Sequence, residues 1–196
     1  YLDYGDTPAF PGCYEIASAV AGTALEGLER IMSGQAVRSF QAIGGLHHAR
    51  RSRSAGFCVF NDLGVVIDSL RSRFGVARIG YVDIDVHHGN GTQAMFYEDP
   101  RVLYVSTHQS PFYPGTGAAD EVGAGEGRGF TVNVPMEAGC TDDDYALVYR
   151  AVVAPVLEQF APDLLLVSAG YDAHERDPLA SMRVTTEGYG SIVQEL

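Results

Sequence analysis

The sequence predicts an α/β fold in which a parallel β-sheet is sandwiched by helices, in a three-layer α/β/α arrangement. Stretches with helical apolar spacing alternate along the chain with short apolar runs of strand length, and this order is typical of a parallel sheet covered on both faces. The strand-like runs at 79–85 and 164–168 are each followed by glycine and polar residues. Sites in such folds form at the carboxyl ends of the strands, so we expect a functional site at that edge.

The amino-terminal part predicts a long helix, a strand and a second helix. The apolar stripe of the long helix consists of Ile16, Val20, Ala24, Leu28 and Ile31. The stripe of the second helix, which ends near Gly75, consists of Leu63, Val66, Ile67 and Leu70. Between the helices, residues 39–43 resemble a strand that leads through a glycine turn to His47 and His48.

The remaining elements follow in the order expected for the same sheet. The predicted strands are 79–85, 102–106, 130–134 and 164–168. Thr141 and Asp144 predict a capping box that opens a helix, and Pro155 predicts a kink within it. The stripe of that helix consists of Tyr145, Val148, Val152, Val156 and Phe160. Residues 187–196 have the character of a further helix.

A group of candidate metal ligands follows the strand at 79–85. Side chains alternate between the two faces of a strand, so Asp83 and Asp85 are expected to point the same way. His87 continues this series if the extended geometry persists beyond the strand. Buried charges cost several kcal/mol unless they are paired or bound to a cation. The pattern therefore favours a metal site over the alternative, a helix cap and turn with a solvated acidic edge.

Asp172 is a further candidate ligand, because it follows the apolar run at 164–168. If both strands belong to one open sheet, Asp172 can meet Asp85 and His87 at its carboxyl edge. Two carboxylates and an imidazole suit a catalytic Zn²⁺ whose remaining ligand is water. Taken alone, an Asp in this position is more often a helix cap.

His47 and His48 are the candidate acid-base residues. An imidazole titrates near pH 6.5, and zinc lowers the pKa of its bound water to about 7, so the two are matched for proton transfer. A neutral histidine can serve first as general base and then as general acid. Asp83, if it is not a metal ligand, can hold one of these imidazoles in its tautomer.

Two other segments resemble a phosphate-binding loop and the nucleophile elbow of a serine hydrolase, but neither fits its motif. The glycine-rich segment 123–129 leads into a strand rather than a helix, whereas a phosphate loop needs a helix N-terminus behind it. A flexible surface loop near the rim of the site is the better interpretation. Residues 167–170 resemble part of a nucleophile elbow, but Leu166 stands where its first glycine belongs. No serine hydrolase is indicated.

The composition predicts a soluble, cytoplasmic enzyme core of one domain. No apolar run approaches the length of a membrane span, no basic leader is visible, and three widely spaced cysteines argue against a disulfide framework. The net charge of −12 argues against nucleic-acid binding. It is explained either by ordinary solubility or by attraction of cationic partners such as Lys-rich tails or polyamines.

Several segments resemble the histone deacetylase and acetylpolyamine amidohydrolase superfamily, in particular its class II-like, bacterial-type members. The matching segments, which occur in the family's order, are 44–49, 54–58, 81–91, 113–117, 168–172 and 177–179. The resemblance implies the arginase-deacetylase α/β fold. It also implies that Asp85, His87 and Asp172 are the zinc ligands and that His48 is the general base and acid.

Further roles are implied by the same resemblance. His47 is the electrostatic partner of the general base and is held by Asp83. The implied substrate-binding residues are Asp6 at the rim, the carbonyl of Gly56, the tunnel walls Phe57 and Tyr113, and Leu179 beyond the metal. The family's structural potassium implies a second cation site, whose ligands would be Asp83, Asp85, the backbone near His87, and Ser106.

The sequence departs from the family pattern at three points. Asn90 stands where many members have an Asp that supports the general base, and a neutral Asn favours the uncharged imidazole of His48. Tyr113 replaces the more usual Phe. The family's catalytic tyrosine follows a glycine-rich segment that is absent before Leu196. We therefore expect residues 1–196 to be a single partial catalytic domain, cut at both ends, with reduced activity.

The predicted function is zinc-dependent hydrolysis of the acetyl amide of an acetylated lysine side chain or a related acetylated amine. No membrane or nucleic-acid partner is expected. One alternative is an arginase-like ureohydrolase with two manganese ions, although residues 172–174 lack the second Asp that such a site wants. The other alternative is a catalytically inactive acyl-lysine-binding protein.

Overall fold

A computed structural model describes residues 1–3 and 5–196 of the chain. The described chain divides into two compact units. The N-terminal unit consists of residues 1–77 and 90–95, and the sheet unit consists of residues 78–89 and 96–196.

Two long helices form most of the N-terminal unit. Helix α1 spans Cys13–Met32 and packs against α2, which spans Asp62–Arg73. An ion pair between Glu29 of α1 and Arg73 of α2 joins their C-terminal parts. The short helix α3, Asn90–Phe96, belongs to this unit except for its last residue.

The buried stripe of α1 differs from the predicted one. Ala17, Ala21 and Leu28 are buried, whereas Ile16 is 57% exposed. The buried face thus agrees with the predicted stripe at Leu28, but in the first half of the helix it is shifted by one position onto Ala17 and Ala21. Of the predicted α2 stripe, Val66, Ile67 and Leu70 are buried and Leu63 is half-buried.

The predicted strand at 39–43 is wrong. These residues belong to no strand, and Phe40 and Ile43 are 75% and 73% exposed. The segment instead runs beside α1, where the side-chain amide of Gln41 donates a hydrogen bond of 2.9 Å to the carbonyl of Val20. No strand of the described chain pairs with it, and an apolar run does not form a strand without such a partner.

The sheet unit contains four parallel strands in the order β3-β2-β1-β4. The strands are β1 Ile79–Asp83, β2 Val102–Gln109, β3 Thr131–Met136 and β4 Leu164–Ser168. Strands β1 and β2 lie in the middle and are buried throughout. All four were predicted, but β1 is two residues shorter than expected, since it ends at Asp83 and not at residue 85.

The register brings the ends of β1 and β4 to one level of the sheet, opposite Ser106 within β2. Asp83, the last residue of β1, lies opposite Ser106 of β2 and Ser168 of β4. The segments that leave β1 and β4 therefore start side by side. This places the residues after Asp83 and after Ser168 at a common edge, as expected for a parallel sheet.

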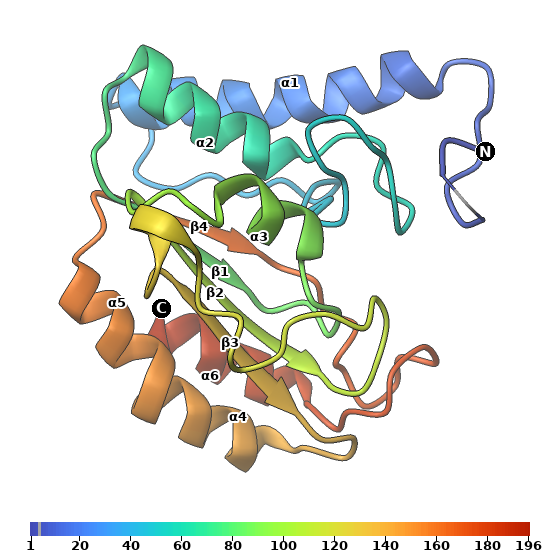
Figure 1. The fold of residues 1–196 in the computed structure, drawn as a ribbon, viewed down its shortest axis with the longest axis vertical. Coiled ribbons are helices and arrows are strands. Elements are labelled where there is room, and N and C mark those ends of the chain that lie inside the picture. Colours follow the sequence, from blue (N-terminus) through green and yellow to red (C-terminus); the bar gives the residue numbers. More distant parts are fainter. Residues whose placement is uncertain (4) are drawn as a thin grey trace. The chain divides into compact units, whose positions relative to one another are not determined.

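The helices of the sheet unit lie together along one face of the sheet (Figure 1). They are α4 Asp142–Val148, a π-helical turn at Tyr149–Val153, α5 Ala154–Phe160 and α6 Thr186–Glu195. The predicted capping box of Thr141 and Asp144 is present. The predicted single helix contains the π-helical turn at Tyr149–Val153, and Pro155 follows this turn in the first turn of α5.

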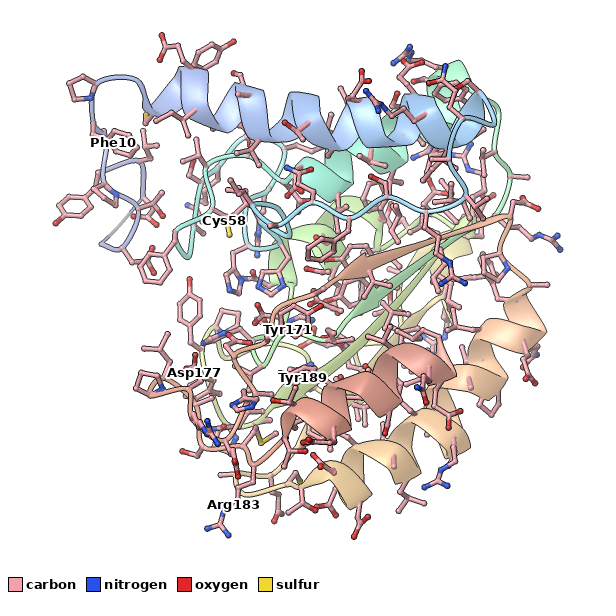
Figure 2. The ribbon with its side chains drawn as sticks, turned by 180° about the vertical axis from the view of Figure 1, so that it is seen from behind. Phe10, Cys58, Tyr171, Asp177, Arg183 and Tyr189 are labelled. Atoms are coloured by element: carbon pink, nitrogen blue, oxygen red, sulfur yellow. The ribbon has the colours of Figure 1, made fainter. Side chains whose placement is uncertain are left out.

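The interior of this unit lies between the sheet and the three helices. Tyr145, Tyr149 and Val153 of the helical layer and Val82 and Val105 of the strands are buried in one cluster. In the segment that follows β4, Tyr171 makes an edge-to-face contact with Tyr189 of α6, with ring centroids 5.0 Å apart (Figure 2).

The glycine-rich segment forms a short 3₁₀ turn at Gly125–Gly127 before β3, and not the start of a helix that could bind phosphate. It is fastened to the sheet unit, since the backbone N–H of Ala124 donates to the carbonyl of Tyr97. In the part of the chain that the structure describes, no helix is both long enough and apolar enough to span a membrane.

Candidate metal centre

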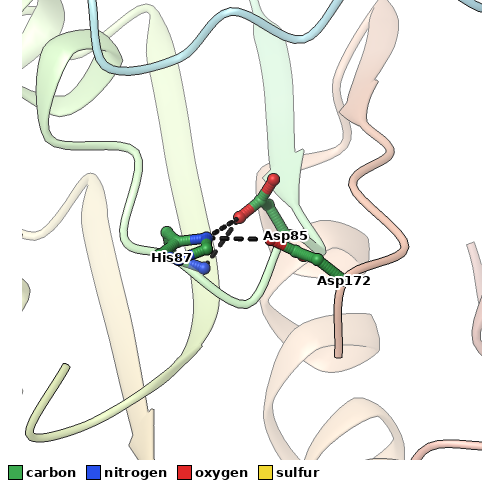
Figure 3. A group of neighbouring side chains, drawn as sticks. All are labelled: Asp85, His87 and Asp172. Carbon is green, nitrogen blue, oxygen red and sulfur yellow. Dashed lines mark hydrogen bonds and ion pairs between the residues drawn. The ribbon is translucent and has the colours of Figure 1, made fainter. Parts of the chain in front are cut away.

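Asp85, His87 and Asp172 form a cluster at the carboxyl edge of the sheet (Figure 3). Each side chain offers one ligand atom, and these atoms all lie within 4.8 Å of one another. The three residues are half-buried. Asp85 and His87 follow β1, whereas Asp172 follows β4, so the cluster depends on the pairing of these two strands.

The imidazole of His87 lies between the two carboxylates. Its Nδ1 atom is 3.0 Å from Oδ1 of Asp85 and 2.8 Å from Oδ2 of Asp172. Burial alone would lower the pKa of His87, but the hydrogen bonds to Asp172 and Asp85 outweigh it and raise the pKa to about 9. At neutral pH the metal-free cluster is thus an imidazolium held by two carboxylates.

This donor set fits a divalent cation. A cation held by all three residues would replace the Nδ1 proton of His87 and would cancel the charge of both carboxylates. One nitrogen and two oxygen donors match the borderline preference of zinc, and three protein ligands leave a position for water or substrate.

The backbone between Asp83 and His87 does not continue as a strand. Residues 85–87 form a bend, so the predicted alternation that placed Asp83, Asp85 and His87 on one face is wrong beyond Asp83. The bend is stabilised by the backbone N–H of His87, which donates to Oδ1 of Asp85 at 2.7 Å. The N–H of Val86 donates to Oδ1 of Asp172 at 2.9 Å, which ties the bend to the segment after β4.

Gly170 provides the space for Asp85. A Cβ atom at position 170 would lie 2.6 Å from Cγ of Asp85 and still closer to one carboxylate oxygen. Only a residue without a side chain therefore lets the segment after β4 approach the ligand this closely.

Asp83 and Ser106 lie opposite each other on β1 and β2, and both are fully buried. The carboxylate of Asp83 accepts hydrogen bonds from the Tyr81 hydroxyl at 3.1 Å and from the backbone N–H of Asp85 at 3.3 Å. The hydroxyl of Ser106 lies 2.9 Å from Nδ1 of His108. These are two of the residues that the sequence suggests for a second cation.

Two aromatic residues flank the candidate ligand His87. The ring of Phe112 stacks on its imidazole, with centroids 5.0 Å apart, and the ring of Tyr113 meets it edge-on at 6.1 Å. Tyr113 is 44% exposed. The structure thus places Tyr113, a predicted substrate contact, beside a predicted ligand.

Two buried histidines hold the loop that contains these aromatic residues. This role was not predicted from the sequence. Nδ1 of His88 lies 2.8 Å from the hydroxyl of Thr116, and Nε2 of His108 lies 2.9 Å from the carbonyl of Gly117. Burial, together with the neighbouring His88, lowers the pKa of His108 to about 4. For His108 the available signal was the polar end of the strand at 102–109, where Ser106, Thr107, His108 and Gln109 follow an apolar start and are all buried.

In the N-terminal unit, His47 and His48 are buried next to each other. Their Nε2 atoms are 3.1 Å apart, and Nδ1 of His48 lies 2.9 Å from Oδ1 of Asn90. Because an amide oxygen only accepts, His48 donates from Nδ1, and its neutral form then has an acceptor at Nε2. Asn90 thus lies at the Nδ1 side of His48, and its predicted role in supporting that imidazole stays a prediction.

Asp6, Gly56 and Phe57 lie in the same unit. The backbone N–H of Gly56 donates to Oδ1 of Asp6 at 3.0 Å. A Cβ at position 56 would lie 2.8 Å from Cγ of His48, so glycine is required beside this imidazole. Phe57 is 73% exposed. Its backbone has a positive φ of 65°, which is uncommon and strained for a bulky residue.

Leu179 is the second predicted substrate contact in the sheet unit. It is 64% exposed, and its backbone N–H donates to Oδ1 of Asp177 at 2.8 Å. The structure therefore brings together two groups of predicted residues. In the sheet unit they are Asp83, Asp85, His87, Ser106, Tyr113 and Asp172, and in the N-terminal unit they are Asp6, His47, His48, Gly56 and Asn90.

The chain resembles proteins of known family along its whole length. The profile of the histone deacetylase domain matches residues 2–196. The acetoin utilization protein AcuC of Bacillus subtilis is 40% identical over 95% of this chain and 49% of its own length. A probable deacetylase of Archaeoglobus fulgidus is 38% identical over 96% of this chain and 53% of its own. The histone deacetylase-like amidohydrolase of Pseudomonas aeruginosa is 40% identical over 94% and 49%.

A solved structure confirms the predicted fold class. The crystal structure of the HDA15 HD domain matches 98% of this chain and 56% of its own chain, with a TM-score of 0.92 and 39% sequence identity. The fold is accordingly the three-layer α/β/α arrangement of the arginase-deacetylase class. The chain spans about half the length of the curated relatives that it matches.

Proposed function

We propose that this chain, which belongs to the histone deacetylase family, takes part in zinc-dependent amide hydrolysis. The bond hydrolysed is the acetyl amide of N-acetyl-lysine or of a related N-acetyl amine. The observation that supports this most is the convergence of Asp85, His87 and Asp172 from two strands onto one small volume. The names of two similar proteins, a probable deacetylase and a histone deacetylase-like amidohydrolase, support the same class of reaction.

Asp85, His87 and Asp172 would bind the zinc ion. When bound, zinc supplies a Lewis acid that polarises the amide carbonyl and makes water more acidic. The two carboxylates set the charge of the site, because they neutralise a divalent ion without further anions. The imidazolium proton of His87 must leave when the metal binds, because a histidine nitrogen coordinates a metal only when it is deprotonated.

His48 is the proposed general base and acid. Its Nδ1–H donates to the neutral amide oxygen of Asn90, so the imidazole is not held as a cation by a carboxylate at that position. Nε2 is then the atom that takes a proton from the attacking water and later returns it to the amine nitrogen as the amide bond breaks. His47, whose Nε2 lies 3.1 Å away, is the proposed electrostatic partner, and its support by Asp83 stays a prediction.

The proposed substrate contacts are Asp6, Gly56, Phe57, Tyr113 and Leu179. Three of them, Phe57, Tyr113 and Leu179, expose apolar surface to solvent, as is expected of side chains that close around an aliphatic lysine stem. The strained backbone of Phe57 is retained at a cost of roughly 1–3 kcal/mol, which is typical of residues under functional constraint. The hydrogen bond from Gly56 to Asp6 orients a carboxylate that we assign to the substrate backbone.

A structural potassium ion is a further part of the proposal. Asp83, Asp85, the backbone near His87 and Ser106 would provide its oxygen ligands. The proposal is supported by the buried carboxylate of Asp83 and its register with Ser106. A potassium site predicts that unfolding temperature rises with KCl more than with equal LiCl, and an identical response to both salts would remove this part.

The proposed setting is a reducing, cytoplasmic one. Cys13, Cys58 and Cys140 are odd in number and widely spaced, which favours a compartment where thiols stay reduced. The proposed partners are acetylated lysine side chains or acetylated amines, whose cationic neighbours suit the net charge of −12.

The test is hydrolysis of a fluorogenic acetyl-lysine peptide by the purified chain loaded with one equivalent of zinc. We expect a zinc-dependent rate that falls at least about 100-fold in His48→Ala and in Asp172→Asn. Undiminished rates in both variants would contradict the proposal. Zinc-dependent peptide binding without hydrolysis would favour the inactive acyl-lysine binder. Two manganese ions per chain with urea release from arginine would favour the ureohydrolase.

A further inference from the structure

We propose that Asn61 and Asp62, at the N-terminus of α2, are positioning residues for the catalytic histidines. They fix the backbone of His47 and His48 from both sides and so keep the Nδ1–H of His48 on Asn90. This inference rests on the proposed role of His48 as general base. All the residues concerned lie in the N-terminal unit.

Asp62 binds the chain just before the histidines. Its Oδ2 accepts from the backbone N–H of Gly45 at 3.1 Å and its Oδ1 from the N–H of Leu46 at 2.9 Å. The residue is only 2% exposed. A buried carboxylate is costly unless it is satisfied by hydrogen bonds, and here both oxygens are used to orient one glycine turn. A Cβ at Gly44 would lie 2.6 Å from Oδ2, so the turn closes tightly on Asp62.

Asn61 binds the chain just after the histidines. Its side-chain amide donates to the carbonyl of Ala49 at 3.0 Å and to the hydroxyl of Thr92 at 2.8 Å. Its Oδ1 accepts from the backbone N–H of Gly64 at 2.7 Å, which caps α2. One buried side chain therefore ties three segments together, and adjacent residues of one helix terminus contact both ends of the histidine segment.

Helix α3 completes the support of the same segment. The backbone N–H of Thr92 donates to the carbonyl of His47 at 3.0 Å. A Cβ at Gly91 would come within 2.5 Å of the carbonyl carbon of His48, so α3 and the histidine segment are in close contact. Asn90, two residues before Thr92, accepts from His48. The hydrogen bond between Asn61 and Thr92 thus couples the position of Asn90 to the N-terminus of α2.

The histidine segment depends on this support because it has no regular structure of its own. Residues 39–49 lie in no helix or strand, so no ladder of backbone hydrogen bonds fixes their conformation. The side chains of Asn61 and Asp62 replace that ladder. If they are removed, the imidazole of His48 can turn away from Asn90, and its two neutral tautomers become similar in free energy.

The test uses Asp62→Asn, which keeps the shape of the side chain but replaces one acceptor oxygen by an amide that faces a backbone N–H. The matched control is Asp68→Asn, because Asp68 lies on the same helix and pairs with the surface residue Arg51. Chain labelled with ¹⁵N-histidine gives the tautomer of His48 by NMR. The rate of acetyl-lysine peptide hydrolysis gives kcat and KM.

We expect the unaltered chain and Asp68→Asn to show His48 in one dominant, Nδ1-protonated tautomer. In Asp62→Asn the second tautomer becomes detectable and kcat falls about tenfold or more, while KM and zinc content stay within twofold. A folded Asp62→Asn protein with unchanged tautomer and kcat would overturn the inference. A purely structural role would instead lower the unfolding temperature without moving either quantity.

A second pair of variants decides the matter if Asp62→Asn does not fold. Thr92→Val removes the hydroxyl that accepts from Asn61 and that also donates to the carbonyl of His47 at 3.4 Å, whereas Thr92→Ser retains it. The inference requires that the second tautomer of His48 be detectable in Thr92→Val but not in Thr92→Ser. Equal spectra of the two variants would overturn it. The NMR result needs no catalysis. If the unaltered chain hydrolyses nothing, the proposed function fails, while the tautomer still decides whether α2 positions His48.

Discussion

Nδ1 of His87 lies 2.8 Å from Oδ2 of Asp172, although the two residues follow different strands of the sheet. The contact exists because β1 and β4 are paired in parallel, with Asp83 opposite Ser168. In the metal-free protein a proton joins the two side chains. A cation bound by both would have to replace that proton, and the first two predictions follow from this competition.

Asp172→Asn should weaken zinc binding at least about 100-fold. Asparagine retains an acceptor for the backbone N–H of Val86, which Asp172 binds at 2.9 Å, so the fold should persist while one ligand charge is lost. Competition with a zinc-sensitive dye gives the dissociation constant. Asp143→Asn, a change of an exposed aspartate in the same unit, is the matched control, and equal affinities of the two variants would refute the ligand assignment.

The metal-free protein should lose stability as pH rises from about 6.5 to 9. The folded-state pKa of His87 is raised to about 9, above its unfolded value of about 6.5. Its stabilising contribution is therefore fully present below pH 6.5 and is lost as pH rises through 9, by up to about 3 kcal/mol. Urea unfolding in the presence of a chelator measures this loss.

Two comparisons make the pH experiment specific to His87. His87→Gln should lack most of the alkaline loss in chelator. Saturating zinc should reverse the trend for the unaltered chain, because the metal competes with the proton and binds more tightly as pH rises. A chelated protein whose stability matched that of His87→Gln at every pH would show that His87 is not held as an imidazolium.

Acid should destabilise the protein through His108. Burial lowers its folded-state pKa to about 4, so the unfolded chain takes up a proton first as pH falls below about 6.5. The stability that depends on neutral His108 is lost between pH 6.5 and 4, by up to about 3 kcal/mol. His108→Asn should be less stable at pH 7 but should lose less over this range, as measured by thermal unfolding. His174→Gln, in the same unit, should lose as much as the unaltered chain, and equal losses in all three would exclude His108 as the cause.

Gly170→Ala should reduce zinc affinity at least about tenfold, because the added Cβ meets the carboxylate of Asp85. Gly190→Ala is the control, since nothing lies within 4 Å of a Cβ at that position of α6. The control should retain zinc binding and gain about 0.5–1 kcal/mol of stability, as helical Gly→Ala changes do. Isothermal titration measures both variants, and the same zinc affinity in both would show that Gly170 does not shape the site.

Much of the fold could be predicted because the sheet unit is locally consistent. The apolar runs at 79–83 and 164–168 became parallel neighbours, and the capping box at Thr141 begins α4 as its sequence indicates. The run at 39–43 has equal local strand character but forms no strand. Strand pairing is a long-range property, which the composition of one segment does not determine.

The candidate site was predicted for a reason that was partly wrong. Strand alternation placed Asp83, Asp85 and His87 on one face. However, β1 ends at Asp83, and a bend at residues 85–87 sets the direction of the Asp85 and His87 side chains. The bend is fixed by hydrogen bonds to Asp85 and Asp172 themselves, and such contacts between distant segments are not visible in local patterns. The supports at Asn61 and Asp62 escaped prediction for the same reason, since they look like an ordinary helix cap.

The most direct test of the metal centre is zinc X-ray absorption on the chain with one equivalent of zinc. The triad of Asp85, His87 and Asp172 predicts one tightly bound ion with only nitrogen and oxygen donors, and the loss of this signal in Asp172→Asn. Sulfur donors, or an unchanged spectrum and occupancy in the variant, would contradict the central claim that these three side chains bind the metal.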